Sequence, residues 1–318
     1  MRRIKTAIFI ITGIICVGVV LYLLLPDRNQ ASLESVETTA SIKNEQVEHK
    51  EGTSAEKTAA EDEAQKELVE KNDHSITEEI KAKVREVVEG ALDLFKKDQR
   101  IVSVGDSLTE GVGDESENGG YVGILNNTFK DHNLNITLDN FGKKGNRSDQ
   151  LLKRLEKDDI SSAIKEADIV LITIGANDIM KVLKSNFMNV TMEPFQEERV
   201  EYIKRLTAIF DKINDLNPDT QIYLIGFYNP FERHFGEIKE LSMIIDSWNN
   251  AGKELTEEYE NANYIPTIDL FSQSTIDLLA EDEFHPNTSG YKLMAKRVLE
   301  YLKESNGDTE ITTVEVAS

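Results

Sequence analysis

The sequence predicts an α/β fold, a three-layer α/β/α sandwich around a central parallel sheet of five strands. Apolar runs of strand length recur along the chain, and amphipathic stretches of helical length separate them. The run at residues 169–174 contains only β-branched residues and leucine, which is typical of a strand buried on both faces. Strands that alternate with helices form parallel βαβ units, and helices then cover both faces of the sheet.

Residues 1–26 predict a membrane anchor. Arg2, Arg3 and Lys5 precede an uncharged stretch, Thr6–Leu25, which ends at Pro26. About twenty residues at a rise of ~1.5 Å match a hydrocarbon core roughly 30 Å thick. The basic flank favours a cytoplasmic N-terminus. We therefore expect a single-pass protein of the cell membrane with its remaining residues outside the cytoplasm.

Two alternatives to an uncleaved anchor remain open. A cleaved signal peptide should have a shorter apolar region that ends in small residues, whereas this stretch ends in Leu23, Leu24 and Leu25. Lipid modification of Cys16 is the other alternative. The bulky Ile15 before that cysteine disfavours it, as does the apolar run that continues beyond it.

Composition limits the partners and the chemistry. The chain has 318 residues with 36 Lys and Arg against 58 Asp and Glu, for a formal net charge of −22. So acidic a surface repels phosphate backbones, which disfavours nucleic acid as a partner. Cys16 is the single cysteine, so neither an intramolecular disulfide nor a cysteine metal site can form.

The segment between the anchor and the folded domain predicts an acidic, disordered linker over residues 27–74. It contains no Phe, Tyr or Trp and is dominated by Glu, Lys, Ala, Thr, Ser and Gln. Such a composition buries too little apolar surface to offset the entropy lost on ordering.

The folded domain is expected to span residues 75–305, followed by a flexible tail at 306–318. It begins with a capping box, Ser75-Ile-Thr-Glu78. Apolar residues then follow at helical spacing: Ile80, Val84, Val87, Ala91 and Phe95. This helix either packs on the domain or forms a stalk.

The remaining elements alternate in type. Strands are expected at 101–104, 135–141, 169–174, 221–226 and 264–268. Helices are expected at 121–130, from 148 or 149 onward, from 194 to 217, within 236–259 and at 288–304. In the long helix after Pro194 we expect five residues to point inward: Val200, Ile203, Leu206, Phe210 and Ile213.

A candidate nucleophile follows the first strand. Gly105 allows a sharp turn, and Ser107 lies two residues later, at the edge where open α/β sheets hold their ligands. By itself this is equally compatible with an ordinary strand-to-helix turn. Gly145, Asn177 and the segment 282–285 also follow predicted strands, so their loops should gather at the same edge.

A serine hydroxyl needs a base, and five histidines could serve: His49, His74, His132, His234 and His285. His285 lies just before the last predicted helix, and Asp282, three residues earlier, is close enough for one turn to bring its carboxylate to the ring. That carboxylate would fix the tautomer and stabilise the imidazolium.

An acyl-transfer intermediate also needs donors for its oxyanion. Gly145 offers an unobstructed backbone amide, and Asn177 offers a neutral side-chain amide. Asn177 could instead cap a helix that begins near Ile179.

Together these segments resemble the SGNH hydrolases, also called the GDSL esterase/lipase family, over about residues 100–303. The four matching blocks are Gly105-Asp-Ser-Leu108, Lys144-Gly-Asn146, Gly175-Ala-Asn-Asp178 and Asp282-Glu-Phe-His285. The resemblance implies a flavodoxin-like fold, an ester substrate, and no metal or organic cofactor. It implies that Ser107 is the nucleophile, His285 the base and Asp282 its orienting partner. The oxyanion hole would comprise the amides of Ser107, Gly145 and Asn177.

Within the family, Tyr228-Asn-Pro-Phe231 and the N-terminal anchor resemble the YpmR-like branch of Gram-positive bacteria. We therefore expect a membrane-anchored extracytoplasmic serine esterase or lipase. The alternatives are an O-acetyl esterase of cell-wall glycan, a non-catalytic wall-binding module and, least favoured, a metallohydrolase. The sequence does not fix the oligomeric state.

Several apolar residues could form either an acyl pocket or ordinary core: Met180, Phe187, Met188, Met192, Phe227, Tyr228 and Phe231. Trp248, in the middle of a predicted helix, is expected to belong to the core. The acidic residues Glu115 and Glu117 are expected in a solvated loop.

Overall fold

The structure is a computed structural model that describes residues 98–314, with side chains described as far as Lys303. The predicted anchor, the linker and the helix that begins at Ser75 lie outside the described residues, as do residues 315–318. Within the described part, no helix has the length and apolar character needed to cross a membrane.

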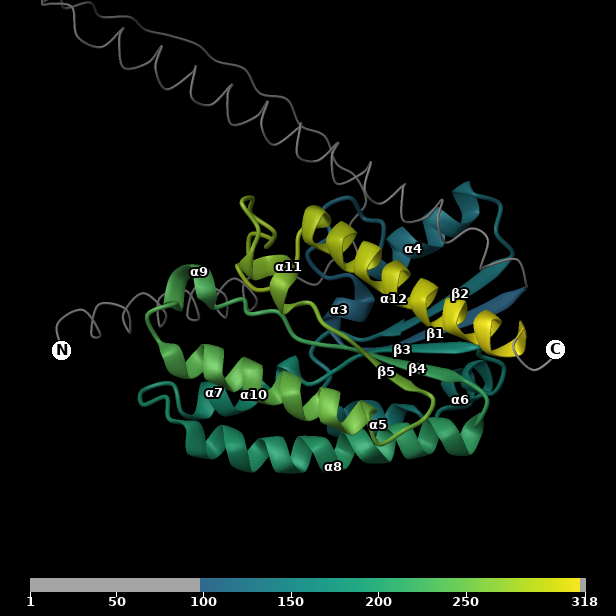
Figure 1. Ribbon diagram of the computed structural model, residues 1–318. Helices are drawn as coiled ribbons and strands as arrows, with labels where there is room; N and C mark the ends of the chain where they lie inside the picture. Colours follow the sequence, from purple (N-terminus) through teal and green to yellow (C-terminus); the bar gives the residue numbers. More distant parts are fainter. Residues whose placement is uncertain (1–97, 315–318) are drawn as a thin grey trace, which may run out of the picture. The chain divides into compact units, whose positions relative to one another are not determined.

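A parallel five-stranded sheet with the order β2-β1-β3-β4-β5 forms the centre of the domain (Figure 1). The strands are β1 (Gln99–Gly105), β2 (Ile136–Gly142), β3 (Ile169–Thr173), β4 (Gln221–Ile225) and β5 (Ala262–Ile265). All five predicted strands are confirmed, with small shifts at their ends. Gly105 pairs with Gly142 on one side and with Thr173 on the other, so β1, β2 and β3 end at the same level. The loops that carry the candidate site residues therefore leave the sheet at one edge.

Helices cover both faces of this sheet (Figure 1). One layer contains α4 (Gly120–Asp131) and α12 (Thr288–Val314). The other contains α5 (Ser148–Arg154), α6 (Asp158–Lys165), α7 (Ala176–Ser185), α8 (Met192–Leu216) and α10 (Lys239–Thr256). Three short helices lie near the carboxyl edge of the sheet: α3 (Ser107–Glu110), α9 (Glu232–Phe235) and α11 (Ile268–Ser272). The predicted three-layer arrangement is confirmed for the described residues.

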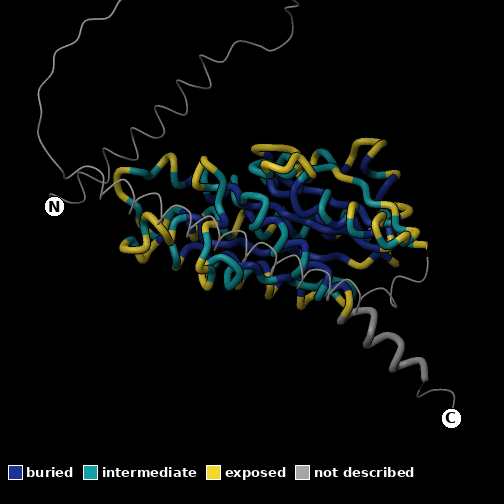
Figure 2. Tube along the Cα trace, turned by 90° about the horizontal axis from the view of Figure 1, so that it is seen from above, coloured by how far each residue is buried: buried dark blue, intermediate teal, exposed yellow. Residues whose placement is uncertain are grey.

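The core consists of two apolar clusters, one on each face of the sheet. In β3, Val170 and Ile172 belong to the cluster under α5–α8 and α10, while Ile169 and Leu171 belong to the cluster under α4 and α12. Because successive side chains of a strand point to opposite faces, a strand covered on both sides must be apolar throughout. Figure 2 shows this buried interior between more exposed outer segments. Trp248 is 1% exposed, which confirms its expected place in the core.

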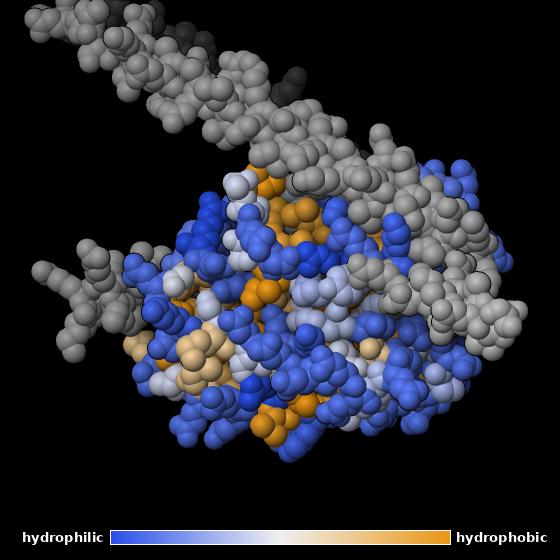
Figure 3. Space-filling view, in the orientation of Figure 1, coloured by the Kyte–Doolittle hydropathy of each residue, from blue (hydrophilic) through white to orange (hydrophobic). Residues whose placement is uncertain are grey.

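The surface is consistent with the acidic composition. Figure 3 shows a face on which hydrophilic residues predominate and hydrophobic residues form separate patches. Glu115 and Glu117 are exposed, as expected for a solvated loop.

Three sequence predictions need correction. Val200 is 52% exposed, because it lies about 200° around α8 from the buried Tyr202 and so faces away from the core. No element was predicted for residues 158–165, yet they form α6, with Ile160, Ala163 and Ile164 buried on one face. The last helix continues past its expected end at Glu304 as far as Val314; no proline interrupts that segment.

Candidate active site

Ser107 is the first residue of α3, immediately beyond β1. The turn before it needs glycine, because a Cβ at residue 105 would lie 2.3 Å from the backbone oxygen of Thr173. Asp106 caps α3 by accepting a hydrogen bond from the backbone N–H of Leu108 at 3.0 Å. The local sequence thus fixes Ser107 at the mouth of the sheet, where its residue surface is 5% exposed.

Ser107, His285 and Asp282 form one hydrogen-bonded line across 178 residues of sequence. The His285 Nε2 lies 2.9 Å from Ser107 Oγ. The other ring nitrogen, Nδ1, lies 2.5 Å from Asp282 Oδ2. With Nδ1 donating to the carboxylate, Nε2 is left to accept the serine proton. The structure therefore brings together the three side chains that the sequence singled out.

The Asp282 carboxylate is held in its charged form. Partial burial raises its pKa, but hydrogen bonds from the His285 ring and from the backbone N–H groups of His285 and Phe284 outweigh this and hold the pKa at about 2. These backbone bonds to Oδ1 measure 2.9 and 3.1 Å. At neutral pH this carboxylate is therefore available to orient the ring and to stabilise its protonated form.

The loop that carries His285 is held from two sides. The Tyr228 hydroxyl donates a hydrogen bond of 2.6 Å to the backbone oxygen of Phe284. On the other side Gly113 approaches so closely that a Cβ there would lie 2.9 Å from His285 Cβ. The loop between α3 and α4, to which Gly113 belongs, and the segment after β4 therefore both support the histidine.

Gly145 lies in the loop that follows β2, and Asn177 is the second residue of α7, just beyond the loop that follows β3. Because β1 lies between these two strands, the two loops flank Ser107. Gly145 has φ +75°, a left-handed conformation that favours glycine, and among the described residues none accepts a hydrogen bond from its backbone amide. Asn177 Nδ2 donates to the backbone oxygen of Asn146 at 2.9 Å, which ties the two loops together. An amide nitrogen carries two protons, so the second remains available to a ligand.

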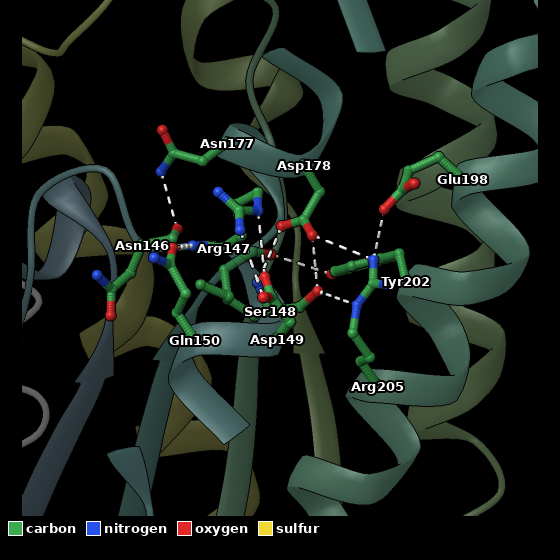
Figure 4. Close-up of polar contacts among 11 residues, drawn as sticks. Asn146, Arg147, Ser148, Asp149, Gln150, Asn177, Asp178, Glu198, Tyr202 and Arg205 are labelled. Atoms are coloured by element: carbon green, nitrogen blue, oxygen red, sulfur yellow. Dashed lines mark hydrogen bonds and ion pairs between the residues drawn. The ribbon is translucent and has the colours of Figure 1, made fainter. Parts of the chain in front are cut away.

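Ser148, Asp178 and Arg205 form a polar cluster next to these segments (Figure 4), which sequence reasoning missed. Asp178, which is 1% exposed, accepts a 3.0 Å bond from Ser148 N–H and a 2.7 Å bond from Ser148 Oγ. Arg205 of α8 donates to Ser148 Oγ at 2.7 Å and lies 3.2 Å from Asp178 Oδ1 and 2.6 Å from Glu198. Burial raises the pKa of Asp178, although the bonds from Ser148 and the Arg205 charge oppose this.

A small apolar pocket opens beside Ser107. Its cavity volume is about 30 Å³, room for roughly two water molecules. Of the seven residues for which the sequence left acyl pocket and core equally open, four line it: Met180, Phe227, Tyr228 and Phe231. Phe284 and Ile245 line it as well. Three other candidates, Phe187, Met188 and Met192, do not line this pocket, and Met188 is 74% exposed.

The other described histidines have different partners. His132 ends α4, where its Nδ1 lies 2.9 Å from the Thr128 backbone oxygen. His234 of α9 is half-exposed and lies 3.0 Å from Glu283. His49 and His74 lie outside the described residues. Between residues 98 and 314, no three His, Cys, Asp or Glu side chains are grouped so that they could hold a metal ion.

Comparisons with known proteins agree with this geometry. The family model described as GDSL-like Lipase/Acylhydrolase matches residues 103–293. The chain is 40% identical over 208 residues to the uncharacterized protein YpmR of Bacillus subtilis strain 168, covering 64% of this chain and 81% of YpmR. It is similar to the solved lipase Lip_vut3 from a goat rumen metagenome, with 26% identity, coverage of 63% and 95%, and a TM-score of 0.57. It also resembles a catalytic mutant of the acetylxylan esterase Axe2 from Geobacillus stearothermophilus, with 25% identity, coverage of 64% and 93%, and a TM-score of 0.50.

Proposed function

The chain belongs to the GDSL-like lipase/acylhydrolase family, and we propose that it hydrolyses carboxylic esters through an acyl-enzyme on Ser107. The observation that carries this proposal is the line of hydrogen bonds from Ser107 Oγ through His285 to Asp282. A nucleophile bonded to a base, with the base bonded to a fixed carboxylate, is the arrangement that activates a serine.

In the first step Ser107 Oγ attacks the acyl carbon while His285 Nε2 accepts its proton. The imidazolium formed is stabilised by the Asp282 carboxylate and then donates its proton to the leaving alcohol. In the second step water attacks the acyl-enzyme, with His285 again acting as the base. Neither step requires a metal or an organic cofactor.

The negative charge that develops on the carbonyl oxygen needs donors on the side away from His285. We assign this role to the backbone amides of Ser107 and Gly145 and to the free N–H of the Asn177 side chain. The last two come from loops on either side of Ser107. Donors fixed in advance stabilise the tetrahedral intermediate without reorganising as the charge appears.

The size of the apolar pocket favours a short acyl group. Its volume of about 30 Å³ accommodates an acetyl methyl group and leaves little enclosed space for a longer chain. A second candidate function, O-acetyl esterase action on cell-wall glycan, is supported by this volume and by the likeness to an acetylxylan esterase. A non-catalytic wall-binding module is less favoured, because the nucleophile, base and carboxylate are all present and bonded.

A fluorophosphonate probe and a series of esters test the proposal together. The folded domain should be labelled, and Ser107→Ala should lose both labelling and turnover. Esters with acyl chains from acetyl to decanoyl, assayed beside acetylated wall polymer, then assign the substrate class. The short esters should give the highest kcat/KM, and release of acetate from the polymer would favour the glycan esterase. Turnover retained in Ser107→Ala would contradict the serine mechanism.

We also propose that the domain acts outside the cytoplasm on a single-pass anchor at residues 6–25, with its N-terminus inside the cell. The support is the length of the uncharged stretch and its basic flank. Protease added to intact spheroplasts should remove the domain. A domain protected until the membrane is permeabilised would contradict this orientation.

A further inference from the structure

We infer that Arg205, acting through Ser148 and Asp178, is a positioning residue that fixes two segments relative to each other. These are residues 143–148, which include Gly145, and residues 174–178, which include Asn177; we call them the oxyanion loops. This inference rests on the proposed function, because it concerns the donors Gly145 and Asn177. None of these three supporting side chains belongs to the hydrogen-bonded line from Ser107 to Asp282. Each is instead adjacent to a donor or bonded to such a neighbour, as Figure 4 shows.

The first step of the argument is the connection between the loops. Asp178 directly follows Asn177, and Ser148 lies three residues after Gly145. The Asp178 carboxylate binds both the N–H and the hydroxyl of Ser148, at 3.0 and 2.7 Å. With the bond from Asn177 Nδ2 to Asn146, the two loops share three hydrogen bonds within a few residues of the donors. A shift of one loop is therefore transmitted to the other.

The second step is the geometry of Arg205. Its Nε donates to Ser148 Oγ at 2.7 Å, while one terminal nitrogen lies 3.2 Å from Asp178 and 2.6 Å from Glu198. A planar guanidinium donates to partners in both loops at once in a fixed geometry, which the compact ammonium group of a lysine reproduces only in part. Arg205 belongs to the 25-residue helix α8, so the loops are fixed to a long element of the scaffold.

The third step is electrostatic. Asp178 is 1% exposed and sits next to the residue that would bind the oxyanion, so its uncompensated charge would oppose the charge developing there. Arg205 supplies the compensating charge, 3.2 Å from the Asp178 carboxylate. Buried ion pairs often add little stability over well-packed apolar residues, and their best-attested use is to specify one arrangement. Here that arrangement would be the one in which both donors face the same point.

The experiment compares Arg205→Met, Arg205→Lys and Ser148→Ala with a matched control, Arg199→Met. Arg199 lies on the same helix and is similarly half-buried, but it bonds Ser247 of α10 rather than an oxyanion loop. We expect Arg205→Met and Ser148→Ala to lower kcat on the order of tenfold, with KM within about twofold. This is less than the loss of a donor itself, because the donors remain present but are misplaced. Arg205→Lys should recover part of the loss, and Arg199→Met should keep the wild-type kcat.

A double-mutant cycle with Asn177→Ala separates positioning from general destabilisation. If Arg205 acts through the donor, Arg205→Met should reduce kcat clearly less in the Asn177→Ala background than in the wild type. Thermal unfolding of each variant confirms that the assay temperature lies below its transition, and Ser148→Ala carries the test if Arg205→Met does not fold.

Three results would overturn the inference: wild-type kcat in Arg205→Met and Ser148→Ala, an equal loss in Arg199→Met, or losses that multiply fully with Asn177→Ala. Ser107→Ala, assayed in parallel, keeps the two proposals apart. If it abolishes turnover while the Arg205 variants stay active, only the positioning role fails. If it remains active, the serine mechanism itself fails.

Discussion

The two sides of Ser107 are built in opposite ways. On the proton-transfer side, His285 binds the nucleophile directly, Asp282 binds His285, and the Asp282 side chain is 49% exposed. On the oxyanion side, the segments that carry Gly145 and Asn177 are joined by the cluster of Ser148, Asp178 and Arg205, in which Asp178 is 1% exposed. One side thus depends on direct hydrogen bonds between the reacting groups, which end at a half-exposed carboxylate. The other depends on hydrogen bonds among Ser148, Asp178 and Arg205, which hold the segments that carry its donors.

This difference predicts how substitutions should act. On the proton-transfer side a substitution removes a reacting group, and the chemistry stops. On the oxyanion side it removes or displaces one of several donors, so the loss should be smaller and confined to the stabilisation of the transition state.

The largest effect is expected for His285→Ala. Without the base, the Ser107 hydroxyl keeps its proton, and kcat should fall roughly 10⁴- to 10⁶-fold. Labelling by the fluorophosphonate should fall with it, since the probe also requires the activated serine. Steady-state kinetics with a short-chain ester measures the change. A loss of less than about a hundredfold would mean that another group accepts the proton, and the contrast between the two sides would disappear.

A smaller effect is expected for Asn177→Ala. Removing one oxyanion donor typically lowers kcat about 10²- to 10³-fold. Because the donor acts on the developing charge, KM for the same ester should stay within about twofold. Initial rates over a range of substrate concentrations separate the two constants. If KM rose while kcat stayed constant, Asn177 would bind the ground state of the substrate, and the oxyanion side would need a different donor.

The contrast also explains what the sequence could predict. All five strands were predicted. A run such as Ile169–Thr173 consists only of β-branched residues and leucine, and this composition indicates a strand that is buried on both faces. Ser107 and the Asp282–His285 pair were also found, since each lies in a compact motif after a predicted strand. The position of Val200 was predicted wrongly. Its inward assignment ignored Tyr202, whose ring is buried and whose hydroxyl donates to the Ile174 backbone oxygen at 3.0 Å.

The oxyanion support could not be predicted in the same way. Arg205 lies 57 residues from Ser148, in a stretch of α8 rich in charged residues that resembles a solvated face. One signal was available: Arg205 lies three residues after the buried Tyr202 and directly before the buried Leu206, at the edge of the buried helix face. A charged residue on an apolar helix face implies a buried partner. Finding that partner required the fold, which brings α8 to the start of α5.

The smallest expected effect concerns Asp106, a buried carboxylate whose pKa depends on charged groups of both sides, His285 and Asp178. Burial raises the pKa of Asp106 to about 7. Hydrogen bonds from the Leu108 N–H and from Thr173 lower this pKa, as does the charge of His285, whereas the charge of Asp178 raises it. A carboxyl whose folded pKa exceeds its unfolded value contributes stability at low pH, which is lost as the pH rises through the folded pKa. Between pH 6 and pH 8 the wild type should therefore lose on the order of 1 kcal/mol of unfolding free energy relative to Asp106→Asn.

Urea unfolding of the wild type and of Asp106→Asn at both pH values measures this difference. Asp282→Asn serves as the control: the Asp282 pKa is held at about 2, so its stabilising effect is complete above about pH 4 and constant in this window. Parallel pH profiles for the wild type and Asp106→Asn would show that Asp106 does not titrate between the two sides. The same loss in the wild type and in Asp282→Asn, but not in Asp106→Asn, would show that Asp106 takes up a proton at near-neutral pH while the exposed carboxylate beside His285 does not.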